Sequence, residues 1–163
     1  MQVSFITASS HIRFGGNPLI LFRISPKTEF QLATRIMATL GNFLIGWGLG
    51  IDVVLLNVAP RILPAEHACL IRDELCPWIA GEPIDSRAAR QFMLCNLAFG
   101  ILRAGGGIYV KQRGAFTLAM LSFLAEAIAV RGEVERDESL RKKAKPAMGL
   151  LLGTFLVMLW KRF

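Results

Sequence analysis

Four apolar runs divide the sequence, and each is close to the length of a membrane-spanning helix. They cover residues 37–58, 89–110, 115–131 and 147–162. An α-helix rises about 1.5 Å per residue, so about 20 apolar residues cross the hydrocarbon core of a bilayer. The helices of a soluble bundle need a polar stripe, and the third and fourth runs have none. The pattern therefore predicts an all-α, integral membrane four-helix bundle over residues 27–163.

Proline and glycine residues mark the expected ends of these runs. Pro60 and Pro64 are expected to end the first span. Gly132 has the place of a C-cap after the third span, and Pro146 is expected to open the fourth. Only the short turn 111–114 separates the second span from the third, so these two spans are expected to form an antiparallel hairpin.

Two polar stretches connect the other spans. Between the first and the second span, residues 65–75 can form a short helix with Leu70, Ile71 and Leu75 on one side. Between the third and the fourth span, residues 133–145 carry a dense charge of both signs, which predicts a solvated link or a surface helix.

Residues 1–26 form a basic N-terminal extension. They contain Arg13 and Arg23, several serines and no acidic residue. This composition is typical of an organellar transit peptide, and the alternative is a basic tail next to the membrane. We expect an ordered extension that leads into a helix, because Ser25-Pro26 has the form of an N-cap with proline at the first helical position.

The composition agrees with burial in lipid. Of the 163 residues, 53% are hydrophobic and 19% are charged, whereas soluble domains carry about 25% charged residues. The net charge is +7, and the basic residues gather at the ends of the apolar runs, where Lys and Arg side chains reach lipid headgroups. A nucleic-acid-binding protein would concentrate this charge on one solvated face. We therefore expect no nucleic-acid partner.

Three ionisable residues lie inside the predicted spans: Asp52, Arg103 and Glu126. Each is costly in hydrocarbon unless it is paired or hydrated. Across the short turn, residues of the second and third spans lie at one depth when their numbers sum to about 225. Arg103 then faces the level of Ser122, and Glu126 lies about one turn beyond, within reach of the arginine. We predict an intramembrane structural pair of Arg103 and Glu126 that holds this hairpin together.

A proton relay through Asp52, Arg103 and Glu126 is the functional alternative to a structural pair. A relay needs more titratable groups along a path, and no histidine lies in the predicted spans. We therefore favour the structural interpretation. In it, Asp52 is an intramembrane acid that lies near the membrane interface or meets a partner subunit.

Small residues form two GxxxG patterns, one from Gly46 and Gly50 and one from Gly149 and Gly153. Such patterns permit the close approach of helices. We expect these glycines to serve helix packing within the bundle, with docking onto a helix of a partner as the alternative. The glycine run 105–107 is expected to loosen or kink the end of the second span.

The sequence lacks the common catalytic and metal-binding motifs. It has no Ser/His/Asp set, HExxH or CxxC motif, and its two histidines, His11 and His67, have no ligand partners at suitable spacing. Its three cysteines give no disulfide framework. We expect a protein that is not an enzyme and has no catalytic or metal site, no cofactor beyond bound lipids and no small-molecule substrate. The expected partners are other membrane protein subunits and lipids.

The second and third spans each contain a short sequence motif that is also found in a known family. The second span opens with an Ala-Arg-x-Phe element, and an inner arginine follows at a set offset. The third span holds a Phe and a Glu that match a His-Phe-x-Ser-Glu element, with Ser122 and Ala125 in place of its His and its Ser. In these elements the chain resembles the ergosterol biosynthetic protein 28 family. The residues that carry the resemblance are Ala89, Arg90, Phe92, Arg103, Phe123 and Glu126.

This resemblance implies a non-catalytic scaffold with four spans that tethers the enzymes of sterol C4-demethylation to the endoplasmic reticulum membrane. A second hypothesis is an accessory subunit of an energy-transducing complex (respiratory, ATP synthase or photosystem) in the mitochondrial inner membrane or the thylakoid. A small transporter is a third. Lys and Arg are nearly balanced between the two sides of the predicted spans, so the sequence does not set the orientation in the membrane.

Overall fold

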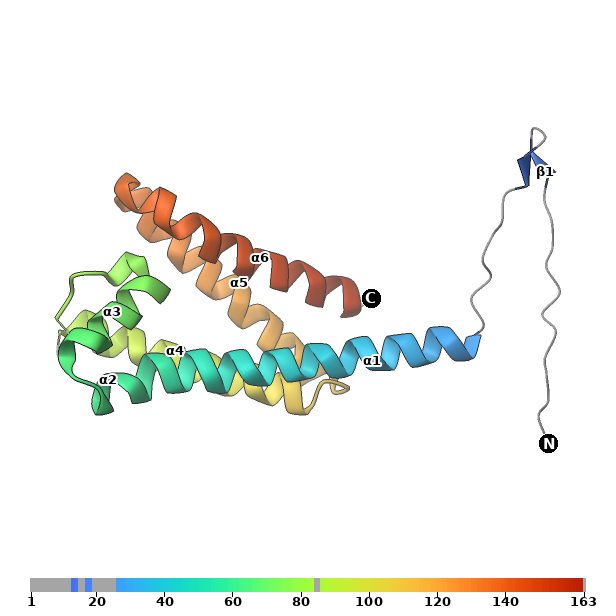
Figure 1. Cartoon of the computed structure of the whole chain (residues 1–163), viewed down its shortest axis with the longest axis horizontal. Coiled ribbons are helices and arrows are strands. Elements are labelled where there is room, and N and C mark those ends of the chain that lie inside the picture. The colour runs from blue at the N-terminus through green and yellow to red at the C-terminus, as the bar shows by residue number, and fades with distance from the viewer. Residues whose placement is uncertain (1–12, 15–16, 19–25, 84–85, 163) are drawn as a thin grey trace. The chain divides into compact units, whose positions relative to one another are not determined.

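The computed structural model describes residues 13–14, 17–18, 26–83 and 86–162 (Figure 1). It divides into a first unit that ends at Ile36 and a second unit that begins at Met37. In the first unit, the two-residue strands β1 (Arg13–Phe14) and β2 (Asn17–Pro18) pair antiparallel, and α1 (Pro26–Ile45) begins. Most of the predicted N-terminal extension, including the expected helix cap at Ser25, lies outside the described residues.

The described residues of the second unit are almost entirely helical. α1 continues without a break into a long π-helix, and two further long helices form the hairpin that the short turn predicts (Figure 1). The elements after α1 are η1 (Gly46–Val58), α2 (Ala59–Ile62), α3 (Ala65–Leu75), η2 (Pro77–Ile79), α4 (Arg87–Ile108), α5 (Arg113–Arg136), η3 (Glu138–Leu140) and α6 (Arg141–Arg162).

Three helical stretches in the described part of the chain are long and apolar enough to cross a membrane. They are Thr28–Ile62, Arg113–Arg136 and Glu138–Arg162, and they contain the first, third and fourth predicted spans. The second predicted span forms α4, which is 22 residues long and is not among the three. Its glycines and its internal polar residues, Asn96 and Arg103, lower its mean hydropathy.

Pro60 does not end the first span, and that prediction was wrong. In η1 the hydrogen bonds reach back five residues, as from the Ala59 N–H to the Val54 carbonyl, whereas the Leu63 N–H donates to the Ala59 carbonyl four residues before it. Pro60, which has no N–H, lies where this pattern changes, so the helix tolerates it. The helix ends instead at Ile62, because the residue before Pro64 is extended.

The predicted junction between the third and fourth spans was also wrong. Gly132 does not cap a helix, because α5 continues to Arg136. Pro146 does not open the last helix, since α6 begins at Arg141 and contains it. Exposed ion pairs, such as Arg131 with Glu135, hold these charged helix ends, and a single 3₁₀ turn joins them. The charged segment therefore extends both helices beyond their apolar parts.

The predicted short helix at residues 65–75 is α3, but its buried face differs from the predicted one. Leu70 is exposed, and Ile71 and Leu75 are half-buried. The buried residues are Ala68 and Arg72. A three-residue apolar pattern on so short a helix did not predict which side faces the bundle.

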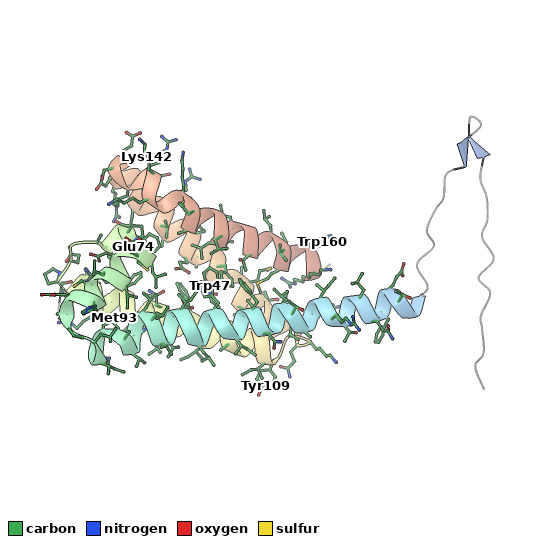
Figure 2. The ribbon with its side chains drawn as sticks, viewed as in Figure 1. Trp47, Glu74, Met93, Tyr109, Lys142 and Trp160 are labelled. Carbon is green, nitrogen blue, oxygen red and sulfur yellow. The ribbon has the colours of Figure 1, made fainter. Side chains whose placement is uncertain are left out.

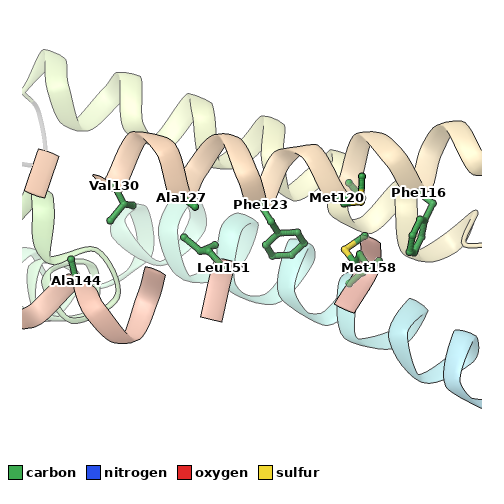
Figure 3. Close-up of a cluster of buried hydrophobic side chains, with 10 residues drawn as sticks. Phe116, Met120, Phe123, Ala127, Val130, Ala144, Leu151 and Met158 are labelled. Carbon is green, nitrogen blue, oxygen red and sulfur yellow. The ribbon is translucent and has the colours of Figure 1, made fainter. Parts of the chain in front are cut away.

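α5 lies at the centre of the packed helices. α4 packs against η1 on one side and α5 on the other, and α6 packs against α5. One apolar cluster fills the space between α5 and α6, with Phe123 near its middle (Figure 3). α6 contributes Ala144, Leu151 and Met158, which recur every seven residues and so form one narrow seam.

The close helix contacts lie at glycines other than the predicted four. A Cβ atom on Gly100 would lie 2.8 Å from the Gly48 carbonyl oxygen, and one on Gly107 would lie 2.7 Å from Ile45 Cγ1. Gly106 approaches Ala119 of α5 in the same way. The glycine run 105–107 therefore does not loosen α4. It allows α4 to contact two neighbouring helices closely.

In the part of the chain that the structure describes, no atom outside their own helix lies within 4 Å of a Cβ added to Gly46, Gly50, Gly149 or Gly153. The prediction that both GxxxG patterns pack within the bundle is therefore wrong. The pattern shows that two small residues share a helix face, but it does not show whether that face meets a neighbour in the same chain.

Candidate functional site

Arg103 of α4 is fully buried and joins three helical elements through its side chain. Its Nη1 donates to Asp52 Oδ2 of η1 at 3.0 Å. Its Nε donates to Ser122 Oγ of α5 at 3.1 Å, and its Nη2 donates to the Ser122 carbonyl at 3.4 Å and to Glu126 Oε2. The structure thus brings together the three ionisable residues of the predicted spans.

The local sequence explains why these groups converge. Ser122 and Glu126 are four residues apart on α5 and so share one face of that helix. Ser122 lies at the level of Arg103, as the short turn predicts. Asp52 comes from η1, which the glycine contact between Gly48 and Gly100 brings against α4. Asp52 is 1% exposed and pairs with Arg103, so it faces the interior of this chain and not a partner subunit, which was one of the two expected positions.

Aromatic rings surround the Arg103 guanidinium. Its Cζ lies 3.9 Å from the centroid of the Phe123 ring, 5.4 Å from that of Phe99 and 5.6 Å from that of Trp47. Trp47 meets Phe123 edge to face at 5.3 Å, and it extends from the long first helix toward α5 (Figure 2). The π faces attract the cation and exclude water from it. The ion pairs of Arg103 are therefore shielded as well as buried.

The charges of this cluster do not balance. Two carboxylates face one guanidinium, so one formal negative charge is left over. The Asp52 side chain is 2% exposed and that of Glu126 is 12% exposed. Glu126 is therefore the acid at which this excess charge can meet another group.

Glu126 lines two cavities, one on each side of the cluster. The larger, of about 560 Å³, lies between α4 and α5 and includes Phe92, Phe99 and Asn96 in its walls. The smaller, of about 230 Å³, is lined from η1, α3 and α6 and includes Asp52. Trp78 of η2 lines both. Both cavities lie toward the end of the bundle where α4 and α6 begin and α5 ends.

The end of α3 and the segment after it carry buried groups near these cavities. Cys76 is 3% exposed, and burial, followed by the charges of Glu126 and Asp52, raises the pKa of its thiol far above the ordinary value. The thiol therefore stays protonated and unreactive. Arg72 is 3% exposed and donates to Asp73 Oδ1 from Nε and Nη2, at 2.9 and 2.7 Å.

Several of the residues that carry the family resemblance are buried or make contacts between elements. Ala89 and Phe123 are fully buried. Phe92 meets Trp78 edge to face, with ring centroids 6.4 Å apart. Arg90 is exposed near the start of α4. Ala89, Phe92 and Phe123 therefore contribute to helix packing, and Phe123 also contacts the guanidinium.

Sequence reasoning missed Asn96, which is 2% exposed. Its Nδ2 donates to the Phe92 carbonyl at 3.0 Å, but its Oδ1 is buried and has no hydrogen-bond partner among the described residues. A signal was present in the sequence. Asn96 precedes Arg103 by seven residues, so the two polar residues lie on one face of the helix.

The arrangement is suited to holding helices together. Each Arg103 nitrogen already donates at least one hydrogen bond. Among the described residues, no group of three His, Cys, Asp or Glu side chains is placed to hold a metal ion. No family model, curated protein or solved structure matches the chain.

Proposed function

We propose that this chain is a non-catalytic membrane scaffold or accessory subunit with four spans, α4 being the second. The observation that carries the proposal is the full burial of Arg103 between Asp52, Ser122 and Glu126. A rigid group of helices with its polar side chains inside can present constant outer faces to partner proteins. Charged residues inside membrane segments usually face the interior of the bundle.

The outer face of α4 supports its assignment as a span. Its 22 residues are about 33 Å long, enough to cross the hydrocarbon core. Leu94, Ile101 and Ile108 are each more than 60% exposed and recur every seven residues, so they form one apolar stripe. Lipid can contact this stripe while Arg103 faces inward. At the end of α6, Trp160 is 73% exposed and stacks with Lys161, as expected of an anchor at the membrane interface.

The two open glycine faces support a role in assembly. Gly46 and Gly50, and Gly149 and Gly153, permit a helix to approach closely, and no described side chain of this protein occupies that space. This agrees with the alternative that we gave for these glycines, docking onto a partner's helix.

Two assemblies remain as candidates. The family resemblance favours tethering of sterol C4-demethylation enzymes at the endoplasmic reticulum. The basic extension at residues 1–26 favours an accessory subunit of a respiratory, ATP synthase or photosynthetic complex. Affinity purification in mild detergent, with identification of the partners, separates the two. Recovery of the chain alone, without either class of partner, would contradict the proposal.

Transport is disfavoured by the position of the cavities. Both lie toward the same end of the bundle, so they do not form a path across it. The purified chain in liposomes is therefore expected to show no proton or solute flux above that of empty liposomes. Flux that is lost on Glu126→Gln would overturn the scaffold proposal.

A further inference from the structure

A further cavity, of about 530 Å³, is lined from α5, the η3 turn and α6. The half-buried side chains of Val134 and Met148 form its apolar part, and charged side chains form the rest of its wall. The charged residues are Arg131, Glu135, Glu138, Arg141 and Lys145. This cavity therefore differs in its chemistry from the two cavities beside the Arg103 cluster.

The charges that line this cavity do not balance. Arg131 Nε donates to Glu135 Oε1 at 2.8 Å. Arg141 Nη1 donates to Glu138 Oε1 at 3.3 Å. Within the part of the chain that the structure describes, Lys145 has no acidic partner. The two acids thus pair with the two arginines, and one formal positive charge is left at the exposed Lys145.

Arg131 and Lys145 lie at nearly one level of the antiparallel pair of α5 and α6. Val130 and Ala144, the residues just before them, are buried in the same apolar cluster (Figure 3). The apolar part of α5 ends at Val130, and that of α6 begins after Lys145. Lysine and arginine at the end of an apolar span reach the level of lipid headgroups. The two cations are therefore placed where a lipid phosphate would lie.

Exposed apolar side chains continue each wall of the cavity toward the membrane. Ile128 precedes Arg131 by three residues on α5, so the two share one helix face. Leu152 follows Lys145 by seven residues on α6 and shares its face in the same way. Ile128 is 63% exposed and Leu152 is 38% exposed. An acyl chain could pack against both side chains, whereas a free phosphate ion would gain nothing from them.

We propose that this cavity binds the headgroup of a phospholipid that carries one net negative charge. The lipid phosphate accepts hydrogen bonds from the Lys145 ammonium and from the guanidinium nitrogens that Arg131 does not use for Glu135. A headgroup that also carries an ammonium group would need an acid of its own, and both acids are already paired. Basic pockets between membrane helices are known sites for anionic lipids. The proposal rests on the membrane insertion of α5 and α6, and not on the scaffold role.

Native mass spectrometry of the full chain in a neutral detergent tests this proposal, because it counts the lipid molecules bound to each protein. The probes are phosphatidylglycerol, with one net negative charge, and phosphatidylcholine with the same acyl chains and no net charge. The first phosphatidylglycerol should bind about fivefold more tightly than the first phosphatidylcholine, the factor usual for one basic residue at an anionic headgroup. Glycerophosphoglycerol, the same headgroup without acyl chains, should not displace it at an equal concentration.

Two variants locate the site. Lys145→Gln removes the uncompensated charge, so the preference for phosphatidylglycerol should disappear. Lys143→Gln is the matched control, because it removes the same charge from the same helix but at a position that does not line the cavity. It should leave the preference at about fivefold. Both lysines are exposed, so neither change should disturb folding.

Equal binding of the two lipids by the unchanged chain would overturn the proposal. So would an equal loss of preference in the two variants, since general attraction to a basic surface would then explain the binding. Displacement by glycerophosphoglycerol would show that the cavity takes a free phosphate group and would contradict a lipid site. None of these outcomes changes which proteins are recovered by affinity purification, so a failure here is distinct from a failure of the scaffold proposal.

Discussion

α4 and α6 are both 22 residues long and both pack against α5, but they differ in what they place inside the bundle. α4 buries Asn96, Arg103 and three glycines. α6 buries only Ala144, Leu151 and Met158 and turns its glycines outward. α6 belongs to one of the three stretches that are long and apolar enough to cross a membrane, whereas α4 does not.

This difference shows that mean hydropathy describes how well a helix surface suits contact with lipid. It does not describe which contacts bind the helix to its neighbours. In lipid, apolar side chains gain little by moving from hydrocarbon to a helix interface. Close backbone contact and hydrogen bonds therefore contribute more to helix association than apolar burial does. α4 has both, through Gly100 and Arg103, whereas α6 is held by side-chain packing along one seam.

The largest expected effect is that of Arg103→Met. It leaves the Asp52 and Glu126 carboxyl groups without their cationic partner, which should lower the free energy of unfolding by about 3–5 kcal/mol. Unfolding in mixed micelles, followed by circular dichroism, measures this change. Arg131→Met is the matched control, because it breaks an exposed ion pair with Glu135 and should cost about 0.5 kcal/mol or less. Equal losses for the two variants would contradict a structural role of Arg103.

Leu151→Ala tests the seam of α6 and should cost about 2–5 kcal/mol, the range for a buried leucine, because it removes apolar contacts and leaves a cavity. Proteolysis at the η3 turn between α5 and α6 should become faster, while the Arg103 cluster stays intact. Leu152→Ala, at an exposed neighbouring position, is the control. Loss of the whole bundle in Leu151→Ala would show that α6 is as essential as α4.

Gly100→Ala tests the close contact of α4 with η1. The added Cβ would lie 2.8 Å from the Gly48 carbonyl oxygen and 2.9 Å from Val53 Cγ2, so the helices must separate. The expected loss is about 1–2 kcal/mol in the free energy of unfolding. Gly149→Ala meets no atom and should instead stabilise α6 by about 0.5–1 kcal/mol, since alanine favours a helix. Similar changes in the free energy of unfolding for the two variants would contradict the difference in glycine packing between α4 and α6.

The smallest expected effect lies at Asp137, which precedes the η3 turn. Its side chain accepts a hydrogen bond from the Ser139 N–H at 2.9 Å, and hydrogen bonds from the Ser139 side chain and then from its N–H lower the pKa of the carboxyl. The carboxylate therefore stabilises the turn above the unfolded pKa of about 3.9, and this contribution is lost as the pH falls through the lowered folded value. Asp137→Asn should slightly speed hydrogen exchange at Ser139 at neutral pH, and the difference should vanish in acid. A difference that persists in acid would exclude the carboxylate as its cause.

Much of the helical structure could be predicted because apolar runs and a short turn act locally. The depth match between Arg103 and Ser122 follows from only four residues of turn, which leave the two helices little freedom to slide. The same reasoning could not place Asp52, because α3 and η2 separate η1 from α4. Its contact with Arg103 depends on long-range packing of Gly48 against Gly100.

The two prolines differ in what their missing N–H costs. Pro60 lies where the hydrogen-bond pattern of η1 changes, which reduces the need for its N–H. Pro146 lies inside α6, beyond its first turn, and the helix continues past it without that hydrogen bond. The prediction for the GxxxG glycines was wrong for another reason. A repeat identifies a helix face, but the rotation of the helix decides which face meets a neighbour, and that rotation is set by the polar residues of the interior.

A double-mutant cycle between Arg103 and Glu126 tests most directly whether the buried cluster holds the bundle together. Arg103→Met, Glu126→Gln and the double variant are compared with the unchanged chain in their free energies of unfolding in nanodiscs or mixed micelles. We predict that the double variant is more stable than the sum of the two losses implies, with a coupling of about 1.5–3 kcal/mol, because the second change removes a buried charge that the first leaves unpaired. Additive losses would show that the two side chains do not stabilise each other and would contradict the account.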